Sequence, residues 1–233
     1  MDNSDNTQLT NNMTLNMIMG NSLDGLQHYL KNEAGVRQGR AIPPLADWHP
    51  NQIADMDLVI KANGEWWHEG SKVSRESLVN LFASILWHTD NNGTSEYFLK
   101  TPVQLLRIQV EDAPLLINDV GIVTENEIRW LEFTTSTGDV VRLDEAHQIQ
   151  LRAYDPNQKR NKESNSDNPN ASMNLAEPEI RPYMPVRQGL MALIGRNVFY
   201  HLTEIGTLSE QNGTTVLTLY SGNQAYAITM PSD

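Results

Sequence analysis

The sequence contains no cysteine among its 233 residues. Disulfide bonds, thiolate catalysis and cysteine-rich metal sites are therefore excluded, and the composition fits a reducing compartment. Basic residues are also few, because 17 lysines and arginines stand against 29 aspartates and glutamates, which gives a net charge of −12. Nucleic-acid binders and anionic-membrane binders depend on clustered basic residues, so this balance argues against both kinds of partner.

Long apolar runs and export signals are missing as well. No apolar run approaches the roughly 20 residues that a membrane helix needs. The first residues, M-D-N-S-D-N-T-Q, are acidic and polar, whereas a signal peptide begins with basic residues. We therefore expect a soluble cytoplasmic protein that has neither nucleic acid nor a membrane as its partner.

The signatures of the familiar enzyme classes are absent. The sequence has no G-x-x-x-x-G-K-S/T, no G-x-G-x-x-G and no G-x-S-x-G. Its six histidines form no H-x-H, H-x-x-x-H or H-E-x-x-H pattern. The sequence therefore predicts no cofactor and no metal site, and it gives no support to an enzyme.

A tight hairpin is predicted around the Asn-Gly dipeptide at 63–64. This dipeptide accepts a positive φ at both centres of a type I′ turn, and alternating apolar residues flank it. A two-residue loop pairs Ile60 with Trp67 and Lys61 with Trp66. The two tryptophans are then expected on opposite faces of the sheet.

An amphipathic helix is predicted directly after this hairpin, at 74–88. Ser74 is the expected N-cap, and Glu76 lies in the first turn, where a carboxylate opposes the positive end of the helix dipole. The apolar residues with helical spacing are Leu78, Val79, Phe82, Ile85 and Leu86.

Strands dominate the rest of the chain. Alternation predicts strands at 96–100, 104–111, 115–123, 127–134, 139–143 and 148–153, with turns at 118–119, 125–126 and 137–138. A second helical pattern consists of Leu190, Leu193, Ile194, Val198 and Leu202, with Gly195 inside it as a point where it can divide. The chain closes on a hairpin with strands at 214–220 and 224–230.

This order of elements predicts an α+β fold. We expect two related units of antiparallel strands, each packed with one helix, at 40–113 and 114–233. An N-terminal segment at 1–39, with a short helix at 22–33, precedes them. The tract at 155–174 is polar and lacks apolar periodicity, so it is predicted to be a disordered insertion in the second unit.

A series of short motifs resembles a bacterial family that is catalogued as a domain of unknown function. The motifs follow one another in order from residue 40 to the end of the chain. They are D-M-D-L at 55–58, N-G-E-W at 63–66 with Gly70, R-E-S-L-V-N-L-F at 75–82, L-K-T-P-V at 99–103, V-E-D-A-P at 110–114, H-Q-I-Q-L-R at 147–152, P-Y-M-P-V-R-Q-G-L-M-A-L at 182–193 and Y-S-G at 220–222.

The resemblance implies a duplicated α+β core whose C-terminal half looks superficially like a pleckstrin-homology fold. It also implies a site for a small, nucleotide-like ligand between the halves and a place in signal transduction. This sequence departs from the family pattern in three ways. Gln104 stands where a glutamate is expected, Asn63 replaces the more usual aspartate, and the insertion at 155–174 is long. The first change removes a carboxylate and weakens any acid–base role.

Two arginines point to an anion site. Arg75 lies at the start of the predicted helix at 74–88, where the dipole disfavours a cation, so an anionic partner is expected, either Asp57 or a ligand phosphate. Arg187 precedes the second helical pattern in the same way. Helix N-termini also offer free N–H groups to anions, so this parallel predicts an anion site shared by the two units.

The other candidate site residues each have a structural alternative. Trp66 could stack on a flat ligand, although a strand tryptophan belongs to the core in roughly two cases of three. His147 could orient a ligand or could be a hydrogen-bonded structural side chain. Four further residues could contact an anion or could belong to an ordinary surface: Lys100, Thr101, Arg107 and Arg152.

Three functional hypotheses follow. The first is a non-enzymatic ligand-binding or regulatory module that takes a small anionic, nucleotide-like molecule in a cleft between the units and acts in signal transduction. Its predicted site residues are Asp57, Trp66, Arg75, Lys100, Thr101, Arg107, His147, Arg152 and Arg187. The second is a protein-interaction module that uses the pleckstrin-like half, which leaves a protein partner or a homodimer open. The third is a metal-assisted hydrolase that uses Asp55, Asp57 and His147.

Overall fold

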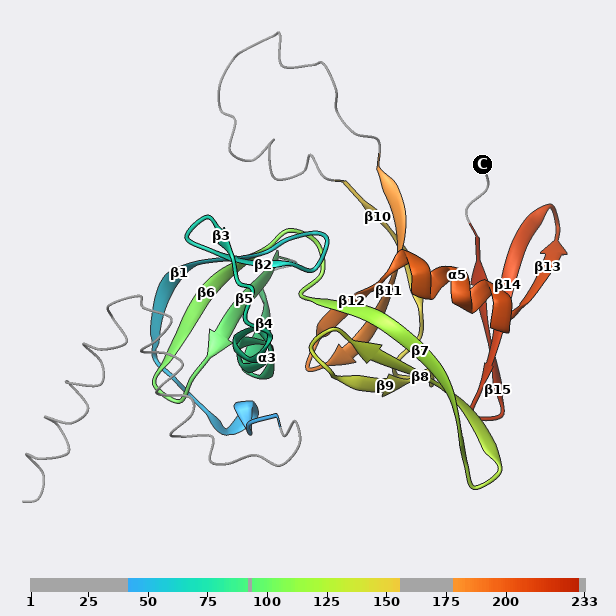
Figure 1. Ribbon diagram of the computed structural model, residues 1–233, viewed down its shortest axis with the longest axis horizontal. Helices are drawn as coiled ribbons and strands as arrows, with labels where there is room; N and C mark the ends of the chain where they lie inside the picture. Colours follow the sequence, from blue (N-terminus) through green and yellow to red (C-terminus); the bar gives the residue numbers. More distant parts are fainter. Residues whose placement is uncertain (1–41, 92–93, 156–177, 231–233) are drawn as a thin grey trace, which may run out of the picture. The chain divides into compact units, whose positions relative to one another are not determined.

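The computed structural model describes residues 42–91, 94–155 and 178–230 (Figure 1). The chain divides into two compact units. The first comprises the residues up to Leu58 together with His68–Ile108, and the second comprises Val59–Trp67 together with the residues from Gln109 onward. The predicted N-terminal segment at 1–39 with its helix, and all but the first residue of the predicted insertion at 155–174, lie outside the described residues.

Six strands form the first sheet, in the order β3-β2-β1-β6-β5-β4. A 3₁₀ helix, η1 (Leu45–Asp47), precedes them. β4, β5 and β6 pair antiparallel in sequence order. The ends of β1 and β6 lie together, because the Glu111 N–H donates to the Ile60 carbonyl over 2.9 Å, as expected for a parallel pair. The strands are β1 (Gln52–Ile60), β2 (Trp66–His68), β3 (Ser71–Lys72), β4 (Leu86–Asn91), β5 (Thr94–Lys100) and β6 (Gln104–Val110).

The predicted first helix is present but short. Helix α3 (Glu76–Ser84) buries Leu78 and Phe82 of the predicted apolar face. Its N-cap is Arg75 rather than the predicted Ser74. The helix ends where the Ile85 N–H donates to the Phe82 carbonyl, and the chain then enters β4, which pairs with β5. The prediction of helix to residue 88 is therefore wrong, because strand pairing takes up these apolar residues.

The hairpin between β1 and β2 has a three-residue loop, so the predicted two-residue type I′ turn is wrong. The Gly64 N–H donates to the Lys61 carbonyl over 2.9 Å, and the Lys61 N–H donates to the Glu65 carbonyl over 2.8 Å. Of the predicted pair of turn residues, Gly64 alone has a positive φ, at +83°. A type I turn followed by one left-handed residue is the usual form of a three-residue hairpin loop.

The longer loop shifts the predicted register by one residue. The bond from the Glu69 N–H to the Asp57 carbonyl, at 3.2 Å, agrees with this register further along the hairpin. Trp66 therefore takes the position opposite Ile60 that was predicted for Trp67. Trp66 is 4% exposed, in agreement with the core alternative, and His68 on the same face is also buried.

The second unit holds a six-stranded sheet in the order β10-β11-β12-β7-β8-β9. β12 pairs parallel with β7, so the sheet is mixed and not purely antiparallel as predicted. The predicted turn at 118–119 is wrong, because β7 runs through it with a register shift between Ile117 and Asp119. The strands are β7 (Leu115–Glu125), β8 (Ile128–Thr135), β9 (Val140–Arg142), β10 (Gln150–Tyr154), β11 (Glu179–Arg187) and β12 (Leu190–Ile194).

The second predicted helix divides at Gly195 into a strand and a helix. The first half is β12, in which every second residue is buried, and the second half is helix α5 (Arg196–Ile205), which buries Val198 and Leu202. Gly195 is the N-cap, and its N–H donates to the Ile117 carbonyl over 2.9 Å. A Cβ at Gly195 would lie 3.0 Å from that carbonyl oxygen, so the glycine allows this close approach.

A small third sheet completes the second unit. It contains β13 (Thr207–Gln211), β14 (Thr214–Ser221) and β15 (Gln224–Thr229) in antiparallel order. Its turn is tied to β8, because the Leu131 N–H donates to the buried Ser221 Oγ over 3.0 Å and the Gly222 N–H donates to the Arg129 carbonyl over 2.9 Å. These bonds give the Y-S-G motif a structural role.

The predicted α+β class is confirmed, as two six-stranded mixed sheets with one helix each and a further three-stranded sheet. That the two units are related, and that the second resembles a pleckstrin-homology fold, stay predictions. Within residues 42–91, 94–155 and 178–230, no helix is long and apolar enough to cross a membrane.

Candidate ligand site

A cavity of about 610 Å³ lies in the second unit. The hairpin loop contributes Ala62 and Asn63, and the first turn of α5 contributes Gly195 and Arg196. Binding sites for small molecules typically have volumes of this order and walls that are mostly apolar. Much of the wall is apolar or aromatic here too and includes Leu116, Leu151, Ile180, Leu193, Phe199 and Met230.

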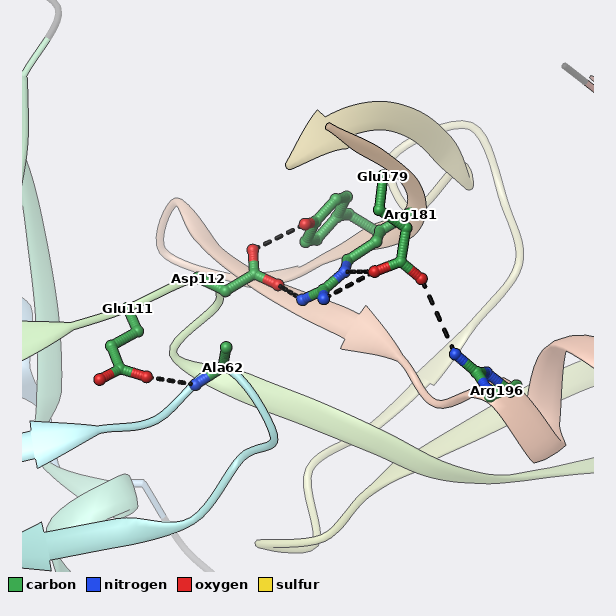
Figure 2. Close-up of polar contacts among 7 residues, drawn as sticks. Ala62, Glu111, Asp112, Glu179, Arg181 and Arg196 are labelled. Carbon is green, nitrogen blue, oxygen red and sulfur yellow. Dashed lines mark hydrogen bonds and ion pairs between the residues drawn. The ribbon is translucent and has the colours of Figure 1, made fainter. Parts of the chain in front are cut away.

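Two arginines and one glutamate bring charge to this cavity (Figure 2). Arg181 projects from β11 and binds Glu179 of the same strand, with 2.8 Å from Nε and 2.7 Å from Nη2 to Oε2. The second oxygen of Glu179, Oε1, lies 3.9 Å from Nη2 of Arg196. One carboxylate therefore lies between two guanidinium groups at the wall of the cavity.

A more buried carboxylate, Asp112, holds Arg181 from the other side (Figure 2). Its Oδ2 accepts from Arg181 Nη1 at 2.8 Å, and its Oδ1 accepts from the Tyr183 hydroxyl at 2.6 Å. The Asp112 side chain is only 6% exposed. The guanidinium also stacks on Tyr154, with 3.8 Å from Cζ to the ring centroid, as in a cation–π contact. Arg181 is thus fixed in position before any ligand arrives.

The Tyr183 hydroxyl should make stability depend on alkaline pH. Burial is the main cause that raises the pKa of Tyr183 above the ordinary value of 10.0, and the hydrogen bond to Asp112 raises this pKa further. Above pH 10 the unfolded chain loses this proton while the folded chain keeps it, so the free energy of unfolding should fall as pH rises. One such group contributes a slope of at most about 1.4 kcal/mol per pH unit.

Urea denaturation at pH 9, 10 and 11 measures this slope. Tyr183→Phe should be less stable than the wild type at pH 9 but should lose stability less steeply between pH 10 and 11. Tyr220→Phe is the control, since the Tyr220 side chain is 65% exposed. Equal slopes for Tyr183→Phe and the wild type would contradict the role given to the Asp112 hydrogen bond.

A third carboxylate, Glu111, fixes the hairpin loop that forms one side of the cavity. Its Oε1 accepts from Lys61 Nζ at 2.8 Å, and its Oε2 accepts from the Ala62 N–H at 3.0 Å (Figure 2). Gly64 of this loop lies close to Leu116, because a Cβ at Gly64 would be only 2.9 Å from a side-chain carbon of Leu116. Leu116 itself lines the cavity, so the loop and the wall pack directly together.

The residues predicted from the sequence lie elsewhere, and none of the nine lines this cavity. In the first unit, Asp57 is exposed in β1, Arg75 is the exposed N-cap of α3, and Arg107 projects from β6. Arg107 makes ion pairs with Asp55 at 2.9 Å and with Glu96 at 3.3 Å. Its charge is therefore balanced by neighbouring carboxylates.

Lys100 and Thr101 of the first unit are buried. The Lys100 ammonium lies 3.8 Å from the centroid of the Trp87 ring, and burial lowers the pKa of this lysine. Thr101 has a structural role, because its hydroxyl donates to the Gln104 carbonyl over 2.9 Å and accepts from the Gln104 N–H over 3.0 Å. The substitution to Gln104 that the resemblance singled out thus stands at a buried turn.

The remaining candidates belong to the second unit. His147 Nδ1 lies 2.8 Å from Oδ1 of Asp144. Arg152 is exposed in β10, and its guanidinium donates a hydrogen bond to the side-chain oxygen of Gln150. Arg187 Nε donates to Asp139 over 2.7 Å, and both side chains are largely buried. The predicted parallel with Arg75 is wrong, because Arg187 ends β11 and all of β12 separates it from α5.

Whether the nine residues share one site between the units stays a prediction. The third hypothesis, a metal-assisted hydrolase, needs side chains that together bind a metal ion. In the described parts of the chain, no cluster of three histidine, aspartate or glutamate side chains could hold one. Of its three residues, Asp55 is paired with Arg107 and His147 with Asp144.

Sequence reasoning missed the charged residues of the cavity, Glu179, Arg181 and Arg196, and also Asp112. Two of the motifs that carry the family resemblance contain or adjoin residues of this cluster. V-E-D-A-P contains Glu111 and Asp112, and P-Y-M-P-V-R begins directly after Arg181 and contains Tyr183. The strand β11 that aligns Arg181 with Tyr183 was not predicted, because two prolines interrupt its sequence.

The fold and the cavity define a two-unit α+β protein with a mostly apolar cavity in its second unit. The model of the DUF1285 N-terminal domain, a domain of unknown function, matches residues 43–113, and the model of the DUF1285 C-terminal domain matches residues 165–228. Together these matches span more than half of the chain. The chain therefore belongs to the DUF1285 family.

Two solved structures are similar to this chain, and the first of them agrees with this assignment. A DUF1285 family protein from Silicibacter pomeroyi DSS-3 is 28% identical, with a TM-score of 0.60, over 86% of this chain and 94% of that chain. A DUF1285 family protein from Shewanella baltica OS155 is 29% identical, with a TM-score of 0.42, over 64% of this chain and 91% of that chain. No curated protein matches the chain.

Proposed function

We propose that this protein is a non-enzymatic ligand-binding module that acts in signal transduction and binds a small organic anion in the cavity of the second unit. The observation that carries the proposal is the wall of this cavity, where Arg181 and Arg196 stand beside apolar and aromatic side chains. A nucleotide-like molecule has both features that such a wall recognises, an anionic group and a flat apolar body.

The donor groups of the two arginines support an anionic ligand. The chain as a whole carries a net charge of −12, which repels anions at long range. At the cavity, Arg181 and Arg196 are balanced by Glu179 and by Asp112 behind Arg181, so an anion would gain from the directed N–H donors of the arginines and not from net charge. Arginine presents planar pairs of N–H donors that match carboxylate and phosphate oxygens, and these bonds strengthen where apolar walls exclude water.

Arg196 gives the sharpest test of this proposal. It lines the cavity, its side chain is 78% exposed, and its ion pair with Glu179 is long at 3.9 Å, so Arg196→Ala should leave the fold intact. We expect a nucleoside monophosphate or phenyl phosphate to raise the melting temperature of the wild type and to raise that of Arg196→Ala much less.

Thermal-shift measurements provide the readout. A ligand at 100 times its Kd adds about 2.7 kcal/mol to stability, and each kcal/mol corresponds to about 2–4 °C for a chain of this size. Arg129→Ala is the matched control, because Arg129 is an exposed arginine of β8 that does not line the cavity. Equal shifts in Arg196→Ala and Arg129→Ala would overturn the proposed site.

One observation favours a protein-interaction module as the second candidate. Tyr220, in the three-stranded sheet, is 65% exposed, and exposed tyrosines are frequent in protein interfaces. The pleckstrin-like character implied by the resemblance would suit such a role. A cooperatively folding protein that shows no thermal shift with any anion, and whose capture of a partner is lost in Tyr220→Ala, would favour this candidate.

A further inference from the structure

We propose that Glu179 is an internal substitute for the anionic group of the ligand. Its carboxylate occupies the Arg181 edge that an incoming anion needs, and the ligand binds by displacing it. This inference rests on the proposed function and adds a regulatory residue to the same cavity.

The geometry of Glu179 is that of a bound oxyanion (Figure 2). Oε2 lies 2.8 Å from Nε and 2.7 Å from Nη2 of Arg181, which form one planar pair of donors. Oε1 points to Arg196, 3.9 Å away. A ligand carboxylate or phosphate in this place would make the same contacts, so the anion and Glu179 cannot both occupy it.

The two carboxylates on Arg181 differ in how easily they can leave. Asp112 is 6% exposed and also accepts from the Tyr183 hydroxyl, so its displacement would leave buried polar groups without partners. The Glu179 side chain is 49% exposed and regains water when it leaves. Asp112 and the Tyr154 ring would hold Arg181 in place while Glu179 is exchanged.

The backbone position of Glu179 also allows this exchange. Glu179 is the first residue of β11, and its pairing with Tyr154 is the last in the register with β10. Its side chain can therefore rotate away without breaking the strand pairing. Exposed ion pairs contribute little to stability, so the ligand has only a small competing interaction to overcome.

This arrangement defines the class of ligand. The anion must carry at least two oxygens that can face both Arg181 and Arg196, as a carboxylate or a phosphate ester does. Its remainder must suit the apolar and aromatic wall near Phe199 and Leu193. Phenyl phosphate and benzoate have this chemistry with different head groups, so a comparison of the two separates a phosphate ligand from a carboxylate ligand.

Isothermal titration of the full chain with phenyl phosphate and with benzoate tests the inference. In Glu179→Gln the competing charge is absent, and we expect the better of the two probes to bind roughly two- to tenfold more tightly than to the wild type. Glu204→Gln is the matched control, because Glu204 is an exposed glutamate of α5 outside the cavity and its loss changes the net charge equally. It should bind the probe like the wild type.

Each outcome separates the two proposals. Binding to the wild type with no gain in Glu179→Gln, or with an equal gain in Glu204→Gln, would overturn the role of Glu179 and leave the proposed site standing. Absence of binding to both the wild type and Glu179→Gln would overturn the site and the inference together. Urea denaturation of Glu179→Gln confirms that a change in affinity does not come from unfolding.

Discussion

Asp112→Ala should lower the free energy of unfolding by about 3 kcal/mol, because it removes one partner from a buried ion pair. The substitution breaks the 2.8 Å bond to Arg181 and the 2.6 Å bond to the Tyr183 hydroxyl. The tyrosine hydroxyl is then buried without an acceptor, and Arg181 keeps only the half-exposed Glu179 as an ionic partner. Equilibrium urea denaturation measures the difference.

The control for this substitution is Asp55→Ala in the first unit. Asp55 also binds an arginine, Arg107, at 2.9 Å, but its side chain is 81% exposed. Exposed ion pairs contribute about 0–1 kcal/mol, so the control should lose no more than that. Losses of similar size in the two variants would contradict the anchoring role of Asp112.

Gly222→Ala should also lower the free energy of unfolding by about 3 kcal/mol. Gly222 has φ +60°, and a side chain in this left-handed region costs about 1–2 kcal/mol. A Cβ there would lie 2.3 Å and 2.5 Å from two ring atoms of Trp130, and such overpacking costs about 1–3 kcal/mol. The effect should appear in the second unit, since both residues belong to it.

Gly213→Ala separates the two contributions. Gly213 has φ +78° in the turn between β13 and β14, but a Cβ there meets no atom within 4 Å. It should lose only the 1–2 kcal/mol that comes from the backbone. If Gly222→Ala were no more destabilised than Gly213→Ala, the contact with Trp130 would not hold the three-stranded sheet to β8.

Local pattern in the sequence predicted most of the strands but not their exact pairing. Alternation found β5 to β8, and in β6 and β8 one face of the strand is clearly more buried than the other. It placed the first hairpin one residue out of register, because Asn63-Gly64 also fits a three-residue loop with one left-handed residue at Gly64. That single residue decides whether Trp66 or Trp67 faces Ile60.

The second helical pattern shows why tertiary context overrides periodicity. Leu190 and Ile194 are four residues apart, which suits a helix, but they are also an even number apart, which suits one face of a strand. In the structure, these residues form a strand up to Ile194 and a helix from Arg196. The division lies at Gly195, where the sequence pattern placed it. Parallel pairing of β12 with β7 then decides the outcome.

The cavity could not be predicted because its parts are distant in the sequence and come from a strand that looked unsuitable. Pro182 and Pro185 argue against a central strand, yet β11 contains both and shifts register between Pro185 and Arg187. Without this strand, Arg181 has no visible relation to Asp112. Charge selected Arg107, and the position before a predicted helix selected Arg187, but both arginines bind nearby carboxylates.

Nuclear magnetic resonance of methionine methyl groups tests the binding of an anion in this cavity most directly. Met230 lines the cavity, whereas Met56 is buried in the first unit and serves as an internal reference. Substitution to leucine assigns each signal. On titration with phenyl phosphate, we expect a saturable shift of the Met230 methyl with little change at Met56, and a strongly weakened response in Arg196→Ala. An unchanged Met230 signal at saturating probe, or a shift confined to Met56, would contradict the proposed site.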